Sequence, residues 1–162
     1  KISMEIKTKT LKTGISFTPI PNRIGKHCDW IDIYLPEEVT IKKGKMVYVP
    51  LNFSIELPKG YVACVYSRSS TPKNWNVIIP NSVGLIDNAY CGNDDIWYLP
   101  LYALKDTTIP KHIRIAQMEI RLSQYATRWQ KIKHLFSSPP KFKVVDNLNN
   151  NNRKGLGSTG VA

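Results

Sequence analysis

The stretch from residue 47 to residue 57 alternates strictly between apolar side chains and others, and this alternation constrains the fold more than any other feature of the chain. Its apolar positions are Val47, Val49, Leu51, Phe53, Ile55 and Leu57. A period of two sustained over such a length is typical of a β-strand with one buried face. Because Pro50 cannot donate a backbone hydrogen bond, we expect an edge strand or a β-bulge there.

Short apolar runs of similar character recur along the chain, and proline or glycine stands in most of the gaps between them. The turn signal Pro58-Lys59-Gly60 predicts a hairpin that returns the chain along residues 61–66. Many short strands separated by such turns predict an all-β fold, either a sandwich or a jelly roll. Further strands are expected within residues 4–8, 75–79, 96–104, 115–121 and 142–145.

Residues 123–136 depart from this pattern, because their apolar side chains recur at helical spacing. Ser123 is suited to be the N-cap, and Pro139-Pro140 stops the helix. We expect one short helix whose apolar face packs on the β domain, with a helix that binds a protein partner as the alternative. The apolar positions are Tyr125, Trp129, Ile132, Leu135 and Phe136.

Composition narrows the classes of protein that the chain can belong to. With 162 residues, 42% of them hydrophobic, it is long enough for one domain with its own core. No apolar run approaches the roughly 20 residues of a membrane span. The beginning of the sequence lacks the apolar block of a signal peptide, so we expect a cytoplasmic protein without membrane contact. Cys28, Cys64 and Cys91 form no Cys-x-x-Cys pair, which argues for free thiols and against structural zinc.

The formal net charge of +11 is high for a chain of this size. The lysines are scattered along the chain without a dense basic block, so we do not expect nucleic-acid binding. A positive field that attracts an anionic substrate remains open, as does a composition without functional meaning.

Residues 84–92 place an acid and an aromatic ring three positions apart. Asp87 and Tyr90 lie between Gly84 and Gly92, after a Pro80-Asn81 turn signal. A β-hairpin with this spacing can direct a carboxylate and a ring at one small ligand while its backbone contacts the ligand's edge. Taken alone, the pattern would favour a hairpin with a surface aspartate and a core tyrosine.

Four further segments, given at the end of this paragraph, accompany this loop. By their order along the chain and by the separations between them, the five segments resemble the motifs of the deoxyuridine triphosphatase (dUTPase) family, over nearly the whole chain. The nearest form is the Bacillus and phage type, and relative to the family residues 123–136 look like an insertion. The four segments are Cys28-Asp29-Trp30-Ile31-Asp32-Ile33, Ser67-Arg68-Ser69-Ser70, Arg114-Ile115-Ala116-Gln117 and Gly155-Leu156-Gly157-Ser158-Thr159-Gly160.

The resemblance implies a jelly-roll homotrimer that hydrolyses dUTP to dUMP and pyrophosphate. Asp87 would be the general base that activates a water for attack on the α-phosphorus. Tyr90 would stack under the deoxyribose and exclude a 2′-hydroxyl group. Backbone groups between Asn81 and Asp87 would pair with uracil, and a fixed donor there would reject cytosine. The other expected substrate contacts are Arg68, Ser69, Ser70, Gly84, Gln117, Arg153, Gly157, Ser158 and Thr159.

The resemblance also implies Mg²⁺, held mainly by the triphosphate oxygens. Asp32 would lie near the metal through a bound water, with a structural role as the alternative. We divide the chain into a β domain, residues 1–146, and a tail, residues 147–162. The asparagine-rich stretch 147–152 predicts a flexible tether. The family's tail motif closes the site of a neighbouring subunit, with Arg153 on the γ-phosphate.

Several positions depart from the family's motifs. Leu156 stands where most relatives have a phenylalanine that stacks on the uracil. The Bacillus type supplies an aromatic lid between the third and fourth motifs instead. By position Tyr98 matches that lid, with Trp97 as the fallback and a core aromatic as the alternative. The remaining departures are Cys91, His112-Ile113 and Lys154.

Two other functions compete with dUTP hydrolysis. The dCTP deaminase family shares the Arg-Ser-Ser motif, but it needs a catalytic glutamate on the strand after the third motif. Only Asp94 and Asp95 follow Gly92 closely here, so we rank deamination lower. The second alternative is regulatory, because some phage relatives bind a protein through the dUTPase scaffold. Residues 123–136 would supply that surface.

Overall fold

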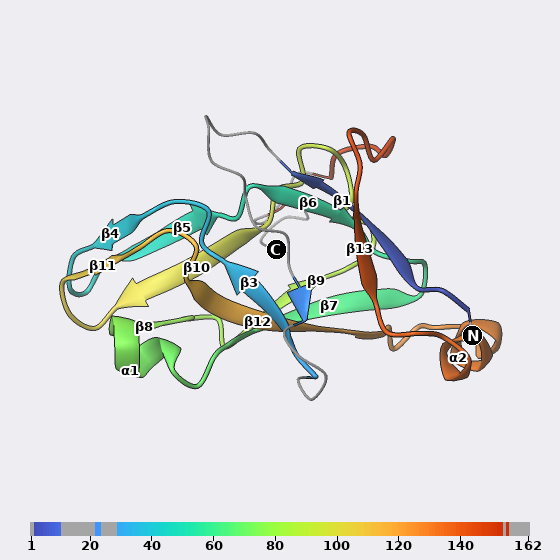
Figure 1. Cartoon of the computed structure of the whole chain (residues 1–162), viewed down its shortest axis with the longest axis horizontal. Coiled ribbons are helices and arrows are strands. Elements are labelled where there is room, and N and C mark those ends of the chain that lie inside the picture. Colours follow the sequence, from blue (N-terminus) through green and yellow to red (C-terminus); the bar gives the residue numbers. More distant parts are fainter. Residues whose placement is uncertain (1, 11–21, 24–28, 154, 156–162) are drawn as a thin grey trace, which may run out of the picture.

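The computed structural model describes residues 2–10, 22–23, 29–153 and 155, with the side chains of residues 22 and 23 left aside. Short β-strands are the main secondary structure of this part of the chain, with two short helices beside them, which confirms the predicted all-β class (Figure 1). No helix among the described residues is long and apolar enough to cross a membrane.

The elements follow one another along the chain with short connections. The helices are α1 (Thr71–Trp75) and α2 (Arg128–Leu135). The strands are β1 (Glu5–Thr10), β2 (Asn22–Arg23), β3 (Ile31–Tyr34), β4 (Val39–Ile41), β5 (Met46–Pro50), β6 (Phe53–Glu56), β7 (Tyr61–Ser67), β8 (Val77–Ile78), β9 (Val83–Ile86), β10 (Tyr98–Ala103), β11 (Thr107–Ile109), β12 (Arg114–Leu122) and β13 (Lys141–Val144).

In the described part of the chain the strands form four sheets. The largest has the order β2-β3-β12-β7-β9 and is antiparallel throughout. The others have the orders β13-β1-β6, β5-β10-β8 and β11-β4. In Figure 1 the sheet of β5 and β10 lies in a layer facing the sheet of β7 and β12. Side chains from both layers belong to one buried cluster, so the sheets share a core.

The expected alternation of buried and exposed residues is present in β1, whereas β3 and β6 each bury three successive residues. In β1, Ile6 and Thr8 are buried while Glu5 and Lys7 are exposed. Trp97, directly before β10, lies at the centre of the core, with its ring centroid 5.4 Å from that of Phe53.

Residues 47–57 form two strands rather than the single strand that the alternation predicts. β5 ends at Pro50, and Asn52 has a φ of 56° before β6 begins. Asparagine adopts this left-handed conformation more readily than most residues, so the chain can bend there. β5 lies at the edge of its sheet, as Pro50 predicts. The expected hairpin with residues 61–66 is wrong, because β6 pairs with β1 whereas β7 pairs with β9 and β12.

The predicted strand at residues 75–79 is also wrong in its first part. Trp75 ends α1, which has a proline in its first turn, where proline is well tolerated. Asn76 then takes a left-handed φ of 51°, and its N–H donates to the carbonyl of Pro72. Only Val77 and Ile78 extend as β8.

The helix predicted within residues 123–136 is present but begins at Arg128. Thr127 is its N-cap, since Oγ1 accepts the N–H of Gln130 and the Gln130 side chain accepts the N–H of Thr127. Ser123, the expected cap, instead accepts the N–H of Tyr125 in the preceding turn. α2 meets the β domain through polar contacts, such as the 3.0 Å hydrogen bond between Tyr61 Oη and His134 Nδ1.

The expectation that the apolar side chains of this segment pack on the β domain is wrong. No residue of α2 is buried. The exposed fractions are 85% for Tyr125, 74% for Trp129, 45% for Ile132, 78% for Leu135 and 61% for Phe136.

Candidate active site

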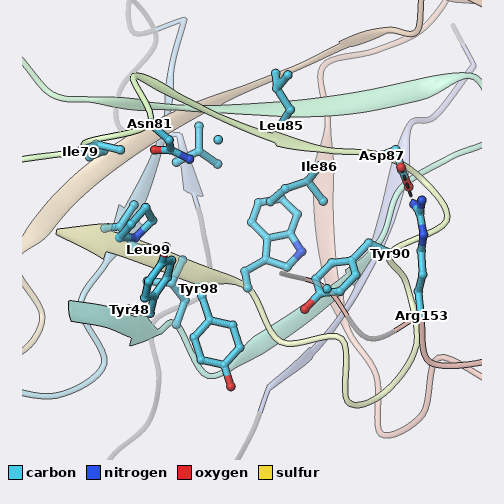
Figure 2. Close-up of a pocket in the computed structure, with 16 residues that line it drawn as sticks. Tyr48, Ile79, Asn81, Leu85, Ile86, Asp87, Tyr90, Tyr98, Leu99 and Arg153 are labelled. Atoms are coloured by element: carbon cyan, nitrogen blue, oxygen red, sulfur yellow. Dashed lines mark hydrogen bonds and ion pairs between the residues drawn. The ribbon is translucent and has the colours of Figure 1, made fainter. Parts of the chain in front are cut away.

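A cavity of about 350 Å³ lies between β9, the start of β10 and the last described residues of the chain (Figure 2). This volume falls within the range of small-molecule sites. Most of its wall is apolar or aromatic, and Asp87 is the only carboxylate among the described residues that line it. Six of the predicted site residues meet there: Asn81, Gly84, Asp87, Tyr90, Tyr98 and Arg153.

Asp87 lies in a loop directly after β9. The predicted hairpin is absent, because β9 pairs with β7, and β10 pairs with β5 and β8. The N–H of Ala89 donates to Asp87 Oδ1 at 2.9 Å, and the Arg153 guanidinium donates to Oδ2 (Figure 2). Burial alone would raise the pKa of Asp87. The hydrogen bond from Arg153, the Ala89 N–H and the guanidinium charge outweigh burial and hold this pKa below the ordinary aspartate value. The carboxylate is therefore charged at neutral pH, as a general base must be.

This balance predicts how the titration of Asp87 responds to Arg153. In the unliganded protein the Asp87 carboxyl should titrate below its ordinary value. In Arg153→Gln burial remains while the guanidinium is lost, so the midpoint should rise. The pair stabilises the fold above the unfolded-state pKa of Asp87, and this contribution is lost as the pH falls through the lower folded-state pKa. Carboxyl chemical shifts measured by NMR against pH test this directly, and an unchanged midpoint in the variant would contradict it.

Tyr90 forms one wall of the cavity, and a hydrogen bond fixes the hydroxyl end of its side chain. Its Oη donates to the carbonyl of Ile96 at 2.7 Å. Burial and the nearby Asp95 raise the pKa of the phenol, so it stays protonated. A Cβ atom on Gly155 would lie 2.8 Å from the Tyr90 ring, so the backbone of Gly155 passes directly over it.

Tyr98 and Trp97, the two candidate lids, lie in different environments. Trp97 is 1% exposed and belongs to the core, although its edge reaches the cavity wall. Tyr98 is 43% exposed at the cavity, where Figure 2 shows it on the same side as Tyr48. Tyr48 lies on the neighbouring strand β5 and is 50% exposed. This geometry favours Tyr98 over Trp97 as the lid. It also shows a second exposed aromatic residue at the cavity, Tyr48, which the motifs do not reveal.

Asn81 occupies the turn that leads into β9. The N–H of Ser82 donates to the carbonyl of Ile79, and Ser82 has a φ of 60°, which confirms the Pro80-Asn81 turn. β9 is the last strand of its sheet in the described structure, so one row of its backbone groups has no strand beside it there. Such an edge can pair with a planar ligand. Tight packing accounts for a glycine at position 84, because an added Cβ would lie 3.3 Å from Val65 Cβ.

A second cluster of predicted residues surrounds Asp32. Asp32 is 4% exposed, and its Oδ1 lies 3.0 Å from Arg68 Nε. Arg114 approaches Oδ2 at 3.6 Å, and Arg68 also donates to the carbonyl of Arg114. Gln117 lies opposite Asp32 in the pairing of β12 with β3. Ser69 and Ser70 follow Arg68 directly, at the start of α1.

The single chain does not bring this cluster to the cavity. Residues that lie opposite each other in antiparallel strands share a face of the sheet. Gln117 lies opposite Asp32 and Tyr66, whereas the cavity is lined by Val65 and Gly84, which alternate onto the other face. The predicted site residues thus divide into a cavity group and an Asp32 group. Gly157, Ser158 and Thr159 lie outside the described residues.

The family model for dUTPase matches residues 20–160. The chain belongs to the dUTPase family. A prophage-derived deoxyuridine 5'-triphosphate nucleotidohydrolase (YosS) from Bacillus subtilis strain 168 is 45% identical over 133 residues, covering 82% of this chain and 84% of that protein.

Solved dUTPase structures share the fold at lower identity. A mutant dUTPase from phage phi11 of S. aureus has a TM-score of 0.63 at 17% identity and covers 75% of this chain and 93% of that one. A mutant of the Staphylococcus bacteriophage 80alpha dUTPase with dUpNHpp has a TM-score of 0.61 at 21% identity. The match covers 96% of this chain and 98% of that one. The fold predicted from the resemblance is therefore confirmed.

Two of the residues that depart from the dUTPase motifs have a defined local environment. His112 takes a φ of 63°, a left-handed conformation that favours glycine. Its N–H still donates to the carbonyl of Leu35 and closes the turn before β12. Burial, followed by the negative charge of Glu56, raises the pKa of the Cys91 thiol, so this cysteine stays neutral beside Tyr90. Cys64 is buried, and both are free thiols.

The described residues offer no ready-made metal cage, because no three histidine, cysteine, aspartate or glutamate side chains cluster among them. Both oxygens of Asp32 face guanidinium groups, which favours a structural role for Asp32 over a role near the metal. An Mg²⁺ ion that depends mainly on triphosphate oxygens fits this arrangement, since it needs few protein ligands.

Proposed function

We propose that the protein hydrolyses dUTP to dUMP and pyrophosphate, as expected for a member of the dUTPase family. The observation that carries this proposal is the convergence of Asp87, Tyr90 and the free edge of β9 on one cavity. The edge would bind uracil, Tyr90 would lie under the deoxyribose, and Asp87 would orient and deprotonate the attacking water. Mg²⁺ bound to the triphosphate would reduce its charge and bring the phosphates into a fixed arrangement.

Arg153 would take part by exchanging partners. In the structure it pairs with Asp87. A triphosphate offers the guanidinium a stronger bidentate partner, which supports a contact with the γ-phosphate once substrate binds. The exchange would leave Asp87 free to accept a proton from water.

The Asp32 group would complete the site from a second copy of the chain. Arg68, Ser69 and Gln117 are expected on the phosphates, yet none of them lines the cavity of the same chain. A homotrimer with sites at subunit boundaries resolves this separation. The charge of +11 supports attraction of the anionic substrate. A cytoplasmic location stays a prediction.

Pyrophosphate release measured with dUTP, dCTP, dTTP and UTP side by side tests the function. We expect turnover with dUTP and at least about a hundredfold lower kcat/KM for the others, since an unpaired polar group or a steric clash costs several kcal/mol. Ammonia release from dCTP would favour the deaminase alternative. Against that alternative, Glu119 lies on β12 and accepts a 2.7 Å hydrogen bond from Tyr66, whose pKa this bond raises to about 12.

Replacing the two candidate lids should give different outcomes. Tyr98→Ala removes an exposed ring at the cavity, so KM for dUTP should rise about tenfold with the unfolding temperature almost unchanged. Trp97→Ala removes a buried ring, which costs roughly 3–5 kcal/mol of folding stability. Steady-state kinetics and thermal unfolding of both variants check this. An unchanged KM in Tyr98→Ala would mean that Tyr98 is not the lid, and that either Tyr48 or no residue has this role.

A second candidate function is protein binding through residues 123–136. The exposure of Tyr125, Trp129 and Leu135 favours it, because single chains rarely expose so many large apolar side chains together. Arg128, Lys131 and Lys133 lie beside them, so we propose a protein segment with apolar anchors and acidic flanks as the partner.

Trp129→Ser with Leu135→Ser tests this surface. Turnover of dUTP should be unchanged, because neither residue lines the cavity, whereas binding of an acidic amphipathic test peptide should be lost. A change in oligomeric state instead would assign the surface to contacts between copies of the chain. Equal peptide binding by the wild type and the variant would remove the proposal.

A further inference from the structure

Tyr48 lines the cavity, and the proposed function gives it no role of its own. It lies on β5 and is 50% exposed. Among the described residues no other aromatic ring is in contact with it. Small-molecule sites are lined mainly by apolar and aromatic side chains. A large ring that is half exposed at a cavity wall is therefore available to a ligand.

The register between β5 and β10 places Tyr48 beside the lid candidate Tyr98. Tyr98 lies opposite Pro50, and Tyr48 lies opposite Pro100, which also lines the cavity. Opposite residues share a face of an antiparallel pair, and so do alternate residues of one strand. Tyr48 and Tyr98 are thus diagonal neighbours on one face. Diagonal neighbours lie roughly 7–8 Å apart, a separation that long aromatic side chains can bridge, so one planar ligand can reach both rings.

The position of Tyr48 along the cavity indicates which part of a nucleotide it would meet. Figure 2 shows Asp87 at one end of the cavity, and Asn81, Leu99 and Tyr48 towards the other end. In the proposed function the α-phosphate lies at Asp87 and the deoxyribose at Tyr90, so the base extends towards Tyr48. The residues that Figure 2 labels at that end are uncharged, which suits a neutral pyrimidine ring.

We propose that Tyr48 is a further substrate-binding residue, whose ring contacts the uracil beside Tyr98. The inference rests on the proposed function, which puts the base at this end of the cavity. The backbone edge of β9 pairs with the polar edge of uracil, whereas the two tyrosines contact the apolar surface of the ring. Stacking of a base on an aromatic side chain is attractive because every base has a π-face. Tyr48 therefore adds affinity for the base and none for the sugar or the phosphates.

Tyr48→Ala tests the proposal through equilibrium binding of dUMP and of an α,β-imido analogue of dUTP. Both ligands carry the same base, so both affinities should fall by the same factor, about tenfold. In steady-state kinetics KM for dUTP should rise by that factor while kcat stays within about twofold, because the lost contact is equally strong in the ground state and the transition state. The side chain is half exposed, so the unfolding temperature should hardly change.

Met46→Ala is the matched control. Met46 lies on the same strand and the same face as Tyr48 and is 48% exposed, but it does not line the cavity. Its replacement should change neither affinity. Tyr48→Phe keeps the ring and should bind both ligands as the wild type does. Tyr48→Leu removes the ring but keeps an apolar side chain in the strand, and it should reproduce the loss if Tyr48→Ala does not fold.

Unchanged dUMP binding in Tyr48→Ala or Tyr48→Leu would overturn the proposal. Equal losses in Met46→Ala would also overturn it, since they would indicate a general distortion of β5. A wild type that binds dUMP but does not hydrolyse dUTP would refute the proposed function, and selective losses in the Tyr48 variants would still support the base contact. Turnover of dUTP with an unaffected Tyr48→Ala would refute the base contact alone.

Discussion

Asp87→Asn is expected to lower kcat for dUTP by about three orders of magnitude while the dUTP analogue still binds. General acid–base groups contribute about 10²- to 10⁴-fold, and an amide cannot accept the proton of the attacking water. The cavity lining contains no other carboxylate among the described residues that could substitute. The backbone N–H of Arg153 also donates to Asp95, so the position of Arg153 should survive the change.

The measurement is single-turnover hydrolysis of dUTP beside equilibrium binding of the analogue. Asp106→Asn, at an exposed carboxylate outside the cavity, is the control, with kcat expected within twofold of the wild type. A fall in binding that equals the fall in turnover would place Asp87 in ground-state contact with the nucleotide rather than in proton transfer. Near-normal turnover would remove Asp87 from the mechanism.

Much of the site was predictable because its chemistry is local in sequence. Asp87 and Tyr90 belong to one loop, and the turn before β9 is signalled by Pro80-Asn81. The division into two groups was not predictable from residue spacing. It depends on the register between β7 and β9, which decides the face of the sheet that each side chain occupies.

The positions of many strands were predictable from the alternation of apolar and polar residues. Which strands pair with one another was less predictable. Period two predicts strands, but it does not say which sheet a strand joins, and the left-handed Asn52 sends β5 and β6 to different sheets. The asparagine-rich run at residues 147–152 predicts a flexible tether, and this stays a prediction. In the structure Asn93 donates a hydrogen bond to Asn147, and Leu148 is buried.

A chain that ends at Asn152 is expected to fold normally and to lose at least about a hundredfold in kcat/KM for dUTP. Removing a charged donor from a phosphate site costs roughly 3–4 kcal/mol in the transition state, a factor of 10² to 10³. The truncated chain keeps Leu148 and Asn152, which hydrogen-bond to Asn93 and Asp94. Thermal unfolding and dUMP binding should match the wild type, and Arg153→Ala in the full chain separates the guanidinium from the residues beyond it.

Co-expression of the truncated chain with the Asp87→Asn chain then shows whose tail closes which site. If the tail of one subunit reaches the site of a neighbour, as the family resemblance implies, some sites of a mixed trimer contain both Asp87 and Arg153. We therefore expect the mixture to recover a measurable part of wild-type turnover, whereas each component alone stays nearly inactive. No recovery would mean that each tail serves the cavity of its own chain, as in the pairing of Arg153 with Asp87.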